Sequence, residues 1–304
     1  MLGVVIANWN GEKILDKCLE SFKLQEFTDY KLYIVDNGSK DKSLNIIRSY
    51  EELLNIELIE LKENSGFAKA NNLGIKKAIG DGCEYILTIN NDTELEKDCL
   101  SNVMKNIEEN KNEFDVYQLF MINFFDRHLC DATGITWDHR LLPSQLGYKQ
   151  EIESITEKNN DLKGVCAGAA VYSAKSLKAV ELENGDYFDS KFFAYYEDVD
   201  LSIRLFRKGF KAKLIKNAII YHIHSATGVK TNGFKEYYMN RNMLVYTKRN
   251  LSEKQYNKYK YVYYKIIIAN MKNNLNNPKV LKSLYRALID GIKLAKETKS
   301  EVDI

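Results

Sequence analysis

The sequence contains few prolines, few histidines and no long hydrophobic run. Two prolines and four histidines occur among its 304 residues. No stretch approaches the roughly 18 consecutive apolar residues that identify a membrane-spanning helix. Val4 to Ala7, near the start, is far too short to be the apolar core of a signal peptide. We therefore expect a cytoplasmic protein, and a position at the inner face of a membrane stays open as an alternative.

The cysteines are scattered, odd in number and free of any Cys-x-x-Cys spacing. There are five: Cys18, Cys83, Cys99, Cys130 and Cys166. This pattern disfavours both a disulfide framework and a zinc site, so reduced thiols are expected.

Strong charge of one sign is also missing. The 44 basic and 42 acidic residues leave a net charge of +2, which argues against nucleic-acid binding through bulk electrostatics. Neither a Gly-x-Gly-x-x-Gly turn after the first predicted strand nor a Gly-x-x-x-x-Gly-Lys-Ser/Thr loop occurs. A dinucleotide cofactor and a P-loop nucleotide site are therefore disfavoured.

Strand and helix patterns alternate in the first third of the chain. Continuous apolar runs predict buried strands, and the segments between them carry apolar residues at helical spacing. The predicted strands cover residues 2–7, 30–35, 56–61 and 85–89. This alternation predicts an α/β fold, in which helices cover both faces of a parallel sheet.

The later chain is less regular. Two more strands are predicted at 164–172 and 211–223, and a helix runs from the acidic cluster to Lys208, where Gly209 stops it. After residue 234 the pattern becomes helical. Lys, Tyr and Ile interleave over 256–271, and this segment is open to three interpretations: packing on the main domain, pairing in a homodimer, or peripheral contact with a membrane surface.

Residues 192–204 hold the densest carboxylate cluster. Glu197, Asp198 and Asp200 follow a wall of aromatic residues: Phe192, Phe193, Tyr195 and Tyr196. Burial behind this wall predicts that at least one carboxylate faces a partly desolvated cleft, where its pKa rises towards that of a general base. The alternative is a helix N-terminus whose acids favour the macrodipole. Arg204 is spaced to pair with Asp200.

Polar side chains also follow two of the predicted strands. Asp36 ends the second strand, and Asn90, Asn91 and Asp92 end the fourth. Ligands bind at this edge in open α/β sheets. Carboxylate and amide oxygens suit Mg²⁺ or Mn²⁺ when substrate phosphates complete the coordination. The same cluster is also typical of a turn or a helix cap.

Taken together, these segments resemble an inverting glycosyltransferase of family 2, in the rhamnosyltransferase-like group. The matching segments are 4–11, 34–39, 64–74, 87–93, 168–169, 196–201 and 221–222. The resemblance implies the GT-A fold, with a mostly parallel central sheet, helices on both faces and a C-terminal helical extension. It divides the chain into a glycosyltransferase domain at 1–228 and the extension at 229–304, which matches no motif.

The resemblance implies a function and a set of donor contacts. A sugar would pass from a UDP- or dTDP-sugar to a hydroxyl of a glycan, lipid-linked or protein-linked acceptor, in cell-surface polysaccharide biosynthesis. Asp36 would read the nucleotide base. The implied donor-binding residues are Asn8, Asn10, Asp36, Asn64, Gly66, Phe67, Asn72, Asn90 and Asn91.

The resemblance also implies the catalytic, metal and acceptor residues. Asp198 falls on the family's general base. Asp92 would be the main ligand of Mn²⁺ or Mg²⁺ in the family's Asp-x-Asp motif, whose first carboxylate is replaced here by Asn90. His222 would be a further metal or diphosphate contact, with His224 as the competing assignment. Acceptor or sugar contacts are implied for Gly168, Ala169, Glu197 and Asp200.

Two other functions stay open. A sugar nucleotidyltransferase would need a Gly-rich basic phosphate loop near the N-terminus, where residues 8–13 offer a single lysine. A catalytically silent nucleotide-sugar binding module would keep the pocket without turnover, and the intact Asp92 and Asp198 argue against it.

Overall fold

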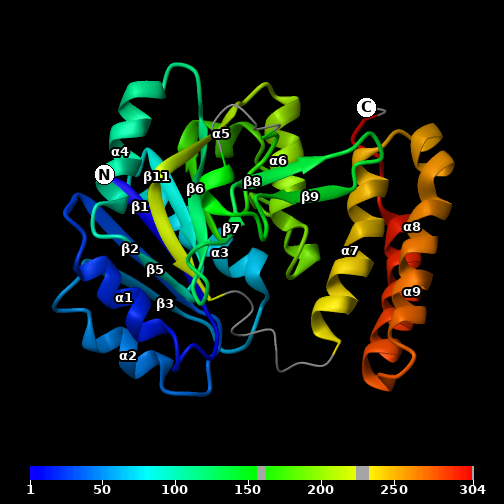
Figure 1. Ribbon diagram of the computed structural model, residues 1–304, viewed down its shortest axis with the longest axis horizontal. Helices are drawn as coiled ribbons and strands as arrows, with labels where there is room; N and C mark the ends of the chain where they lie inside the picture. The colour runs from blue at the N-terminus through cyan, green and yellow to red at the C-terminus, as the bar shows by residue number, and fades with distance from the viewer. Residues whose placement is uncertain (156–161, 224–232, 303–304) are drawn as a thin grey trace.

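The computed structural model describes residues 1–155, 162–223 and 233–302, and its centre is a nine-stranded sheet (Figure 1). The strand order is β3-β2-β1-β4-β10-β6-β11-β5, and β7 pairs with β6. Their bounds are β1 Leu2–Asn8, β2 Tyr30–Asp36, β3 Ile56–Glu60, β4 Tyr85–Ile89, β5 Thr93–Leu95, β6 Val116–Asn123, β7 Cys130–Ala132, β10 Ala169–Ser173 and β11 Ala212–His222.

The sheet is mostly parallel, as predicted. β1 pairs in parallel with β2 and β4, and β2 pairs in parallel with β3. The antiparallel strand β10 lies between β4 and β6, so β6 and its parallel neighbour β11 run in the same direction as β4. Within the described residues, six of the nine strands therefore share one direction.

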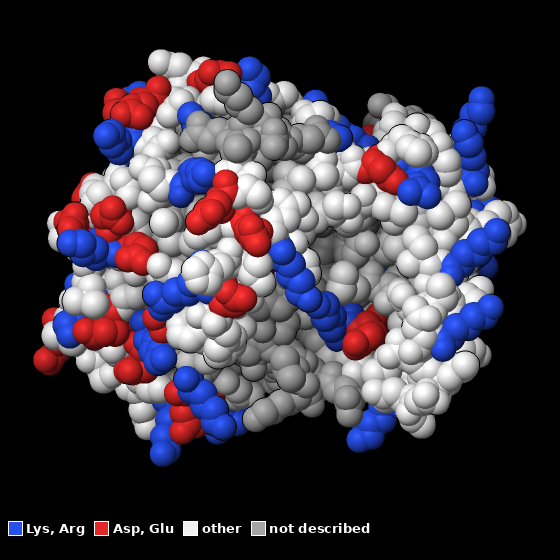
Figure 2. All heavy atoms as spheres, viewed as in Figure 1, with Lys and Arg blue, Asp and Glu red and all other residues white. Residues whose placement is uncertain are grey.

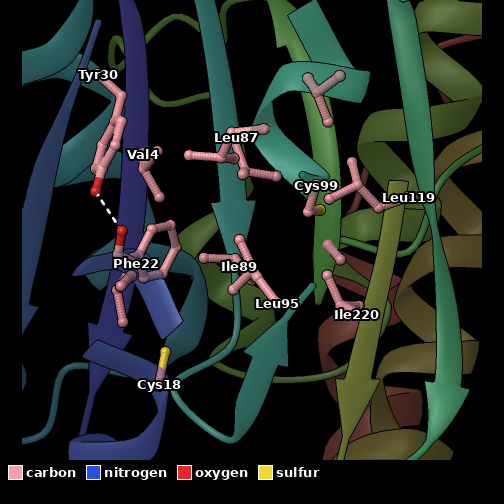
Figure 3. Packing of buried hydrophobic residues seen from close by; sticks show 14 of the residues in the cluster. Val4, Cys18, Phe22, Tyr30, Leu87, Ile89, Leu95, Cys99, Leu119 and Ile220 are labelled. Carbon is pink, nitrogen blue, oxygen red and sulfur yellow. Dashed lines mark hydrogen bonds between the residues drawn. The ribbon is translucent and has the colours of Figure 1, made fainter. Parts of the chain in front are cut away.

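Helices cover both faces of the sheet. The helices of the sheet domain are α1 Leu15–Lys23, α2 Ser43–Ser49, α3 Phe67–Gly80, α4 Cys99–Asn110, α5 Ala174–Ala179 and α6 Glu197–Arg207. Val4 of β1 packs with Phe22 of α1 and Cys99 of α4 on one face (Figure 3). Val5, the next residue, packs with the α3 and α6 side chains on the opposite face. This alternation explains why β1 reads as a continuous apolar run.

The predicted strand at 164–172 is shorter in the structure. β10 begins only at Ala169, because the N–H groups of residues 165–167 bond to side chains instead of to a neighbouring strand, and Gly164 forms only a single bridge to Ile135. Val165 N donates to Ser202 Oγ at 3.1 Å and Cys166 N donates to Gln118 Oε1 at 2.7 Å. The prediction was therefore wrong for 164–168, and this stretch instead forms part of the site described below.

Three helices follow the sheet domain: α7 Phe234–Asn250, α8 Glu253–Asn273 and α9 Pro278–Glu297. The helical pattern predicted after residue 234 is confirmed, and Figure 1 shows these helices beside one end of the sheet domain. Met243, Leu244 and Tyr246 of α7 share a buried cluster with Phe192 and Tyr196 of the acidic segment. A short hairpin, β8 Gly134–Trp137 and β9 Pro143–Leu146, adjoins this cluster. None of the helices in the described chain has the length and apolar character needed to cross a bilayer.

Candidate functional site

A cleft of about 390 Å³ opens at the carboxyl edge of the sheet, where β1, β4 and β11 end beside the first turns of α6 and α7. It gathers predicted site residues that lie far apart in sequence. Those lining it are Asn8, Asn64, Phe67, Asn90, Asn91, Asp92, Gly168, Glu197, Asp198 and His222. Those that do not line it are Asn10, Asp36, Gly66, Asn72, Ala169 and Asp200.

A chain of hydrogen bonds links three strand ends at this edge. Asn91 Nδ2 donates to Asn8 Oδ1 at 2.8 Å, and Asn8 Nδ2 donates to Asp36 Oδ1 at 2.9 Å. The parallel register that sets Asn8 opposite Asp36 makes this possible. Ser39 also donates to both oxygens of the Asp36 carboxylate. Asp36 is 1% exposed, so in this conformation it acts on the cleft through Asn8.

The other predicted donor residues that lie off the cleft contact neighbouring segments of the chain. Asn72 is buried, donates from Nδ2 to Phe188 O at 2.7 Å and accepts at Oδ1 from Phe188 N at 2.9 Å. Asn10 accepts from Lys40 N at 2.8 Å. Gly66 has φ +90°, and a Cβ there would lie 2.6 Å from Phe193 O. Only glycine combines this backbone conformation with so close a neighbour.

Asp92 and His222 converge at the end of β4 and β11. Asp92 Oδ1 lies 3.2 Å from His222 Nε2, and Asn90 Nδ2 lies 3.3 Å from the same nitrogen. The other ring nitrogen, Nδ1, lies 2.6 Å from Asp131 Oδ2 in β7. Asp131 is 1% exposed, and sequence analysis did not identify it. His224, the competing assignment, lies outside the described residues.

This donor set fits a divalent cation shared with a phosphate ligand. No group of three or more His, Cys, Asp or Glu able to enclose a metal occurs within the described ranges. However, Mg²⁺ is usually held by one or two carboxylates, with substrate phosphates and water completing the shell. Asp92 supplies one carboxylate and His222 one imidazole to the same point. Asp131 behind the ring repeats the carboxylate–histidine arrangement that orients metal-binding histidines.

The imidazole lies between two carboxylates, and its electrostatics follow from them. Burial alone would lower the pKa of His222, but its hydrogen bonds to Asp131 and Asp92, with their negative charges, raise the pKa to about 9. Without a cation, the protonated ring neutralises part of the acidic charge at the strand ends, and a cation at Nε2 would take the place of that proton.

Glu197 and Asp198 form a desolvated carboxylate pair at the first turn of α6. Asp198 Oδ1 accepts from Val199 N at 2.8 Å, and Oδ2 accepts from Ala167 N at 3.3 Å. Burial raises the pKa of Asp198, although these backbone bonds oppose the shift. Burial, reinforced by the charge of Asp198, raises the pKa of Glu197 well above its usual range. Within the described chain, Glu197 Oε2 has no hydrogen-bond partner.

Asp200 faces away from the cleft into an ion-pair network. Its Oδ2 lies 3.0 Å from Arg204 Nε and 3.3 Å from Arg249 Nη1, and its Oδ1 accepts from Asn250 Nδ2 at 3.0 Å. The predicted Asp200–Arg204 pair is therefore confirmed. Burial would raise the pKa of Asp200, but the two arginines hold it below its usual value. The predicted acceptor contact of Asp200 stays a prediction.

Of the two small residues predicted near the acceptor, one lines the cleft and the other is buried in the sheet. Gly168 lines the cleft, and its carbonyl accepts from Asn90 N at 3.0 Å. A Cβ at Gly168 would lie 3.1 Å from Asn90 Nδ2, so a side chain would press on the amide beside Asp92. Ala169 is buried in β10.

Sequence analysis missed several residues that line the cleft. Besides Asp131, these are Trp9, Asn37, Gln145 and three residues of α7: Phe234, Lys235 and Met239. Trp9 and Asn37 lie within the matching segments 4–11 and 34–39 and could have been found from them. The α7 residues carry no signal, because they belong to a segment that matches no motif.

The chain is similar in sequence to known proteins. The sequence profile described as Glycosyl transferase family 2 matches residues 3–180. A curated relative, the poly(ribitol-phosphate) beta-N-acetylglucosaminyltransferase TarS of Staphylococcus aureus strain Mu50, is 28% identical over 123 residues. The alignment covers 40% of this chain and 21% of TarS, so the chain spans about a fifth of that relative's length.

Solved structures show the same fold at lower identity. The structure of S. aureus TarS 1–349 in complex with UDP-GlcNAc superposes with a TM-score of 0.61 and 19% identity, covering 97% of this chain and 81% of that one. The mannosyltransferase PcManGT of Pyrobaculum calidifontis, in complex with GDP-Man and Mn²⁺, gives a TM-score of 0.57 and 13% identity, covering 96% and 75%. The GT-A fold is confirmed, and the rhamnosyltransferase-like subgroup stays a prediction.

Proposed function

The chain belongs to glycosyl transferase family 2, and we propose that it transfers a sugar from a UDP- or dTDP-sugar to an acceptor hydroxyl, with inversion at the anomeric carbon. The observation that carries the proposal is the arrangement of the cleft. The desolvated carboxylates Glu197 and Asp198 share it with the strand-end set of Asn8, Asn91 and Asp92. The two carboxylates supply a base, and the strand-end residues supply polar contacts for a nucleotide diphosphate.

Asp198 is the general base in this mechanism. The acceptor hydroxyl attacks the anomeric carbon from the face opposite the leaving diphosphate, and its proton passes to the Asp198 carboxylate. The N–H groups of Val199 and Ala167 each hold one oxygen of that carboxylate, so its orientation is fixed before the acceptor binds. The raised pKa of Asp198 brings its basicity closer to that required at neutral pH.

Glu197 positions a hydroxyl of the acceptor or of the transferred sugar. Its pKa is raised well above the usual range, and a carboxyl group kept protonated by its surroundings can donate a hydrogen bond. Its Oε2 has no partner within the described residues, so a substrate hydroxyl would satisfy a buried polar atom that otherwise costs stability.

The donor side uses amides and carboxylates. Asn8, Asn64 and Asn91 contact the nucleotide, and Asp36 fixes the Asn8 amide that faces it. Asp92 and His222 would hold Mn²⁺ or Mg²⁺ when it is bound, and the cation would offset negative charge on the leaving diphosphate. Asn90 contributes an amide where the family motif has a carboxylate, so this site carries less negative charge than an Asp-x-Asp pair.

The acceptor is proposed to be a cell-surface polymer or its lipid-linked precursor. Support comes from the named activity of TarS on poly(ribitol phosphate), a polyol whose hydroxyls suit the attack described above. The donor is proposed to be a UDP- or dTDP-sugar, and the structure of TarS in complex with UDP-GlcNAc supports a UDP-sugar. Cytoplasmic location and homodimer formation stay predictions.

The composition of the outer face of α8 favours contact with a membrane. Lys254, Lys258, Lys265 and Lys272 are all exposed, and exposed apolar side chains occur between them at three- and four-residue spacing. These are Tyr261, 62% exposed, Ile268, 43%, and Leu275, 65%, the last lying just past the helix. Residues 253–297 hold ten basic and three acidic residues, and on the edge of Figure 2 that α8 and α9 form the charged side chains are mainly Lys and Arg. We propose that this face contacts an anionic lipid surface.

The test of the transfer reaction uses the purified chain with Mn²⁺ and a panel of UDP-GlcNAc, UDP-glucose and dTDP-rhamnose. Poly(ribitol phosphate), poly(glycerol phosphate) and short glycans serve as acceptors. Nucleoside diphosphate release with a product of inverted anomeric configuration supports the proposal. In a parallel assay with UTP and N-acetylglucosamine 1-phosphate, formation of UDP-GlcNAc with release of pyrophosphate would indicate a sugar nucleotidyltransferase instead. Tight donor binding without any turnover across the panel would indicate a silent binding module.

A further inference from the structure

The backbone immediately before Glu197 is bent through three unusual conformations. Phe193, Tyr195 and Tyr196 have φ values of +67°, +66° and +74°, although none of them is glycine. At Phe193, ψ is −60°, and Ala194 N donates to Phe192 O at 2.8 Å, which makes a strained γ-turn. Bulky residues adopt such angles only where the surrounding structure holds them there.

One side chain of α7 provides most of that hold. Asn242 is fully buried, and its Nδ2 lies 2.9, 2.8 and 2.7 Å from the carbonyl oxygens of Phe192, Ala194 and Tyr195. Its amide therefore spans the bend and bonds the carbonyls that the turn leaves without partners in a helix or strand. A side-chain amide placed among three carbonyls fixes their relative positions.

A second residue fixes the orientation of the Asn242 amide. Arg241 Nε donates to Asn242 Oδ1 at 2.8 Å, so Nδ2 must face the bend. Arg241 Nη2 donates to Lys191 O and Phe192 O at 2.8 and 2.9 Å, at the start of the same segment. Two consecutive residues of α7 thus hold residues 191–195.

The bend leads directly into the catalytic helix. Tyr196 O accepts from Asp200 N at 2.9 Å, so Tyr196 closes the first turn of α6. Glu197 and Asp198 lie within that turn, and their backbone direction is set by the residues that Asn242 holds. Phe193 also stacks on Tyr238 of α7, with ring centroids 5.0 Å apart.

We propose that Asn242 is a positioning residue of the active site, which places Asp198 for proton transfer by holding the strained segment 192–196. The inference rests on the proposed function of Asp198. It assigns part of the catalytic geometry to α7, within the segment 229–304 that carries no family motif.

The test compares Asn242→Ala with a matched control on the same helix. Asn240 is 7% exposed, and its amide bonds Glu236 O and Asn270 Nδ2, away from the bend. Asn240→Ala therefore removes a buried amide of equal size without touching residues 192–196. Arg241→Ala serves as a second, milder variant if Asn242→Ala does not fold.

Two measurements are made on each variant. Amide hydrogen exchange of residues 192–199 reports the hold on the bend directly. Turnover of UDP-GlcNAc, UDP-glucose and dTDP-rhamnose, with UDP titration for donor affinity, reports catalysis. We expect faster exchange at 192–199 in Asn242→Ala and a kcat lower by about 10²-fold with donor affinity retained, since small misplacements of reacting groups have this effect. Asn240→Ala should match wild type in both at equal folded fraction.

Each outcome decides the proposal. Unchanged exchange in Asn242→Ala, or faster exchange with normal kcat, would overturn it, as would equal losses of kcat in both variants. If wild type turns over none of the donors, the proposed function fails instead, and the exchange data still decide whether Asn242 holds the segment. If wild type is active and Asp198→Asn is not, a normal Asn242→Ala enzyme rejects this inference alone.

Discussion

Asp131 Oδ2 lies 2.6 Å from His222 Nδ1, on the side of the ring opposite Asp92. The ring is thereby fixed with Nε2 towards the cleft. Asp131 belongs to a three-residue strand, β7, whose pairing with β6 brings the carboxylate behind β11. The pair forms only in the folded chain, between residues 91 positions apart.

The first prediction concerns this pair. Asp131→Ala removes the acceptor that orients His222, so Mn²⁺ affinity should fall by roughly 10- to 100-fold, the usual effect of losing such a partner. Isothermal titration with Mn²⁺ in the presence of UDP measures this change. Asp126→Asn, an exposed residue of the preceding loop, is the control and should bind normally. Equal affinity in Asp131→Ala and wild type would show that Asp131 does not support a metal ligand.

The second prediction concerns the general base. Asp198→Asn keeps the side-chain volume but cannot accept a proton at neutral pH. Turnover should fall by about 10² to 10⁴, the usual contribution of a positioned acid or base, while UDP affinity changes little. Glu197→Gln should cost less, because it is not assigned the proton. Near-normal turnover in Asp198→Asn, or a product with retained configuration, would contradict the assignment.

The third prediction concerns Glu197 and pH. Because burial raises its folded pKa, the folded state binds the proton more tightly than the unfolded state. The resulting stability is complete below the unfolded pKa of about 4.3 and is lost as pH rises through the raised value. Glu197→Gln should therefore gain stability relative to wild type as pH rises from about 4.3 to 8. Urea unfolding across this range measures the difference, and a constant difference would contradict the prediction.

Most of the fold was predictable because each of its first strands is encoded by a short, continuous run of apolar residues. The apolar runs and their helical partners identified β1 to β4 and the parallel arrangement, since residues buried on both faces leave a clear signal in the sequence. The stretch 164–168 misled the same reasoning. Its apolar and small residues look like a strand, but the N–H groups of Val165 and Cys166 bond to the side chains of Ser202 and Gln118, partners that no local pattern reveals.

The residues of the candidate site that belong to sequence motifs were predictable. Asp198, Asp92 and His222 all line one cleft, as the ordered motifs suggested. Asp131 and Asn242 could not be found in this way. A single aspartate in a short strand, and a single asparagine among many in an Asn-rich chain, gain their meaning only from the partner that folding places beside them.

The fourth prediction concerns the network that ties α6 to α7. Asp200 is fully buried with Arg204 and Arg249. Asp200→Asn removes the carboxylate that pairs with Arg204, whereas Arg249 keeps its pairs with Asp189 and Glu301. Unfolding free energy should fall by roughly 3–5 kcal/mol, as for other broken buried pairs. Since the folded pKa of Asp200 is lowered, its contribution is present above the unfolded pKa of about 3.9 and is lost as pH falls through the folded value.

The control for this network is an exposed pair. Glu108 and Lys111 lie 2.7 Å apart with side chains 73% and 45% exposed, and Glu108→Gln should change stability by less than about 1 kcal/mol. Equilibrium urea unfolding of both variants at pH 7 makes the comparison. Similar losses in the two variants would mean that the Asp200 network is no stronger than a surface ion pair.

The last prediction concerns the outer face of α8. Replacing Lys258, Lys265 and Lys272 together by Glu reverses the charge between Tyr261, Ile268 and Leu275.

Binding of this triple variant to vesicles containing phosphatidylglycerol should weaken by roughly 100-fold or more, because each lysine near an anionic surface contributes about 1 kcal/mol. Co-sedimentation measures the binding, and raising the salt concentration should also weaken membrane binding of the wild-type chain.

The matched control replaces Lys97, Lys105 and Lys208 by Glu. These lysines are exposed elsewhere, so this variant should retain most of the binding. Equal losses in the two triple variants would mean that net charge alone is responsible. Wild-type binding that is equally strong on phosphatidylcholine alone would remove the electrostatic basis of the contact, and a wild-type dimer that the α8 substitutions dissociate would identify the face as a subunit interface instead.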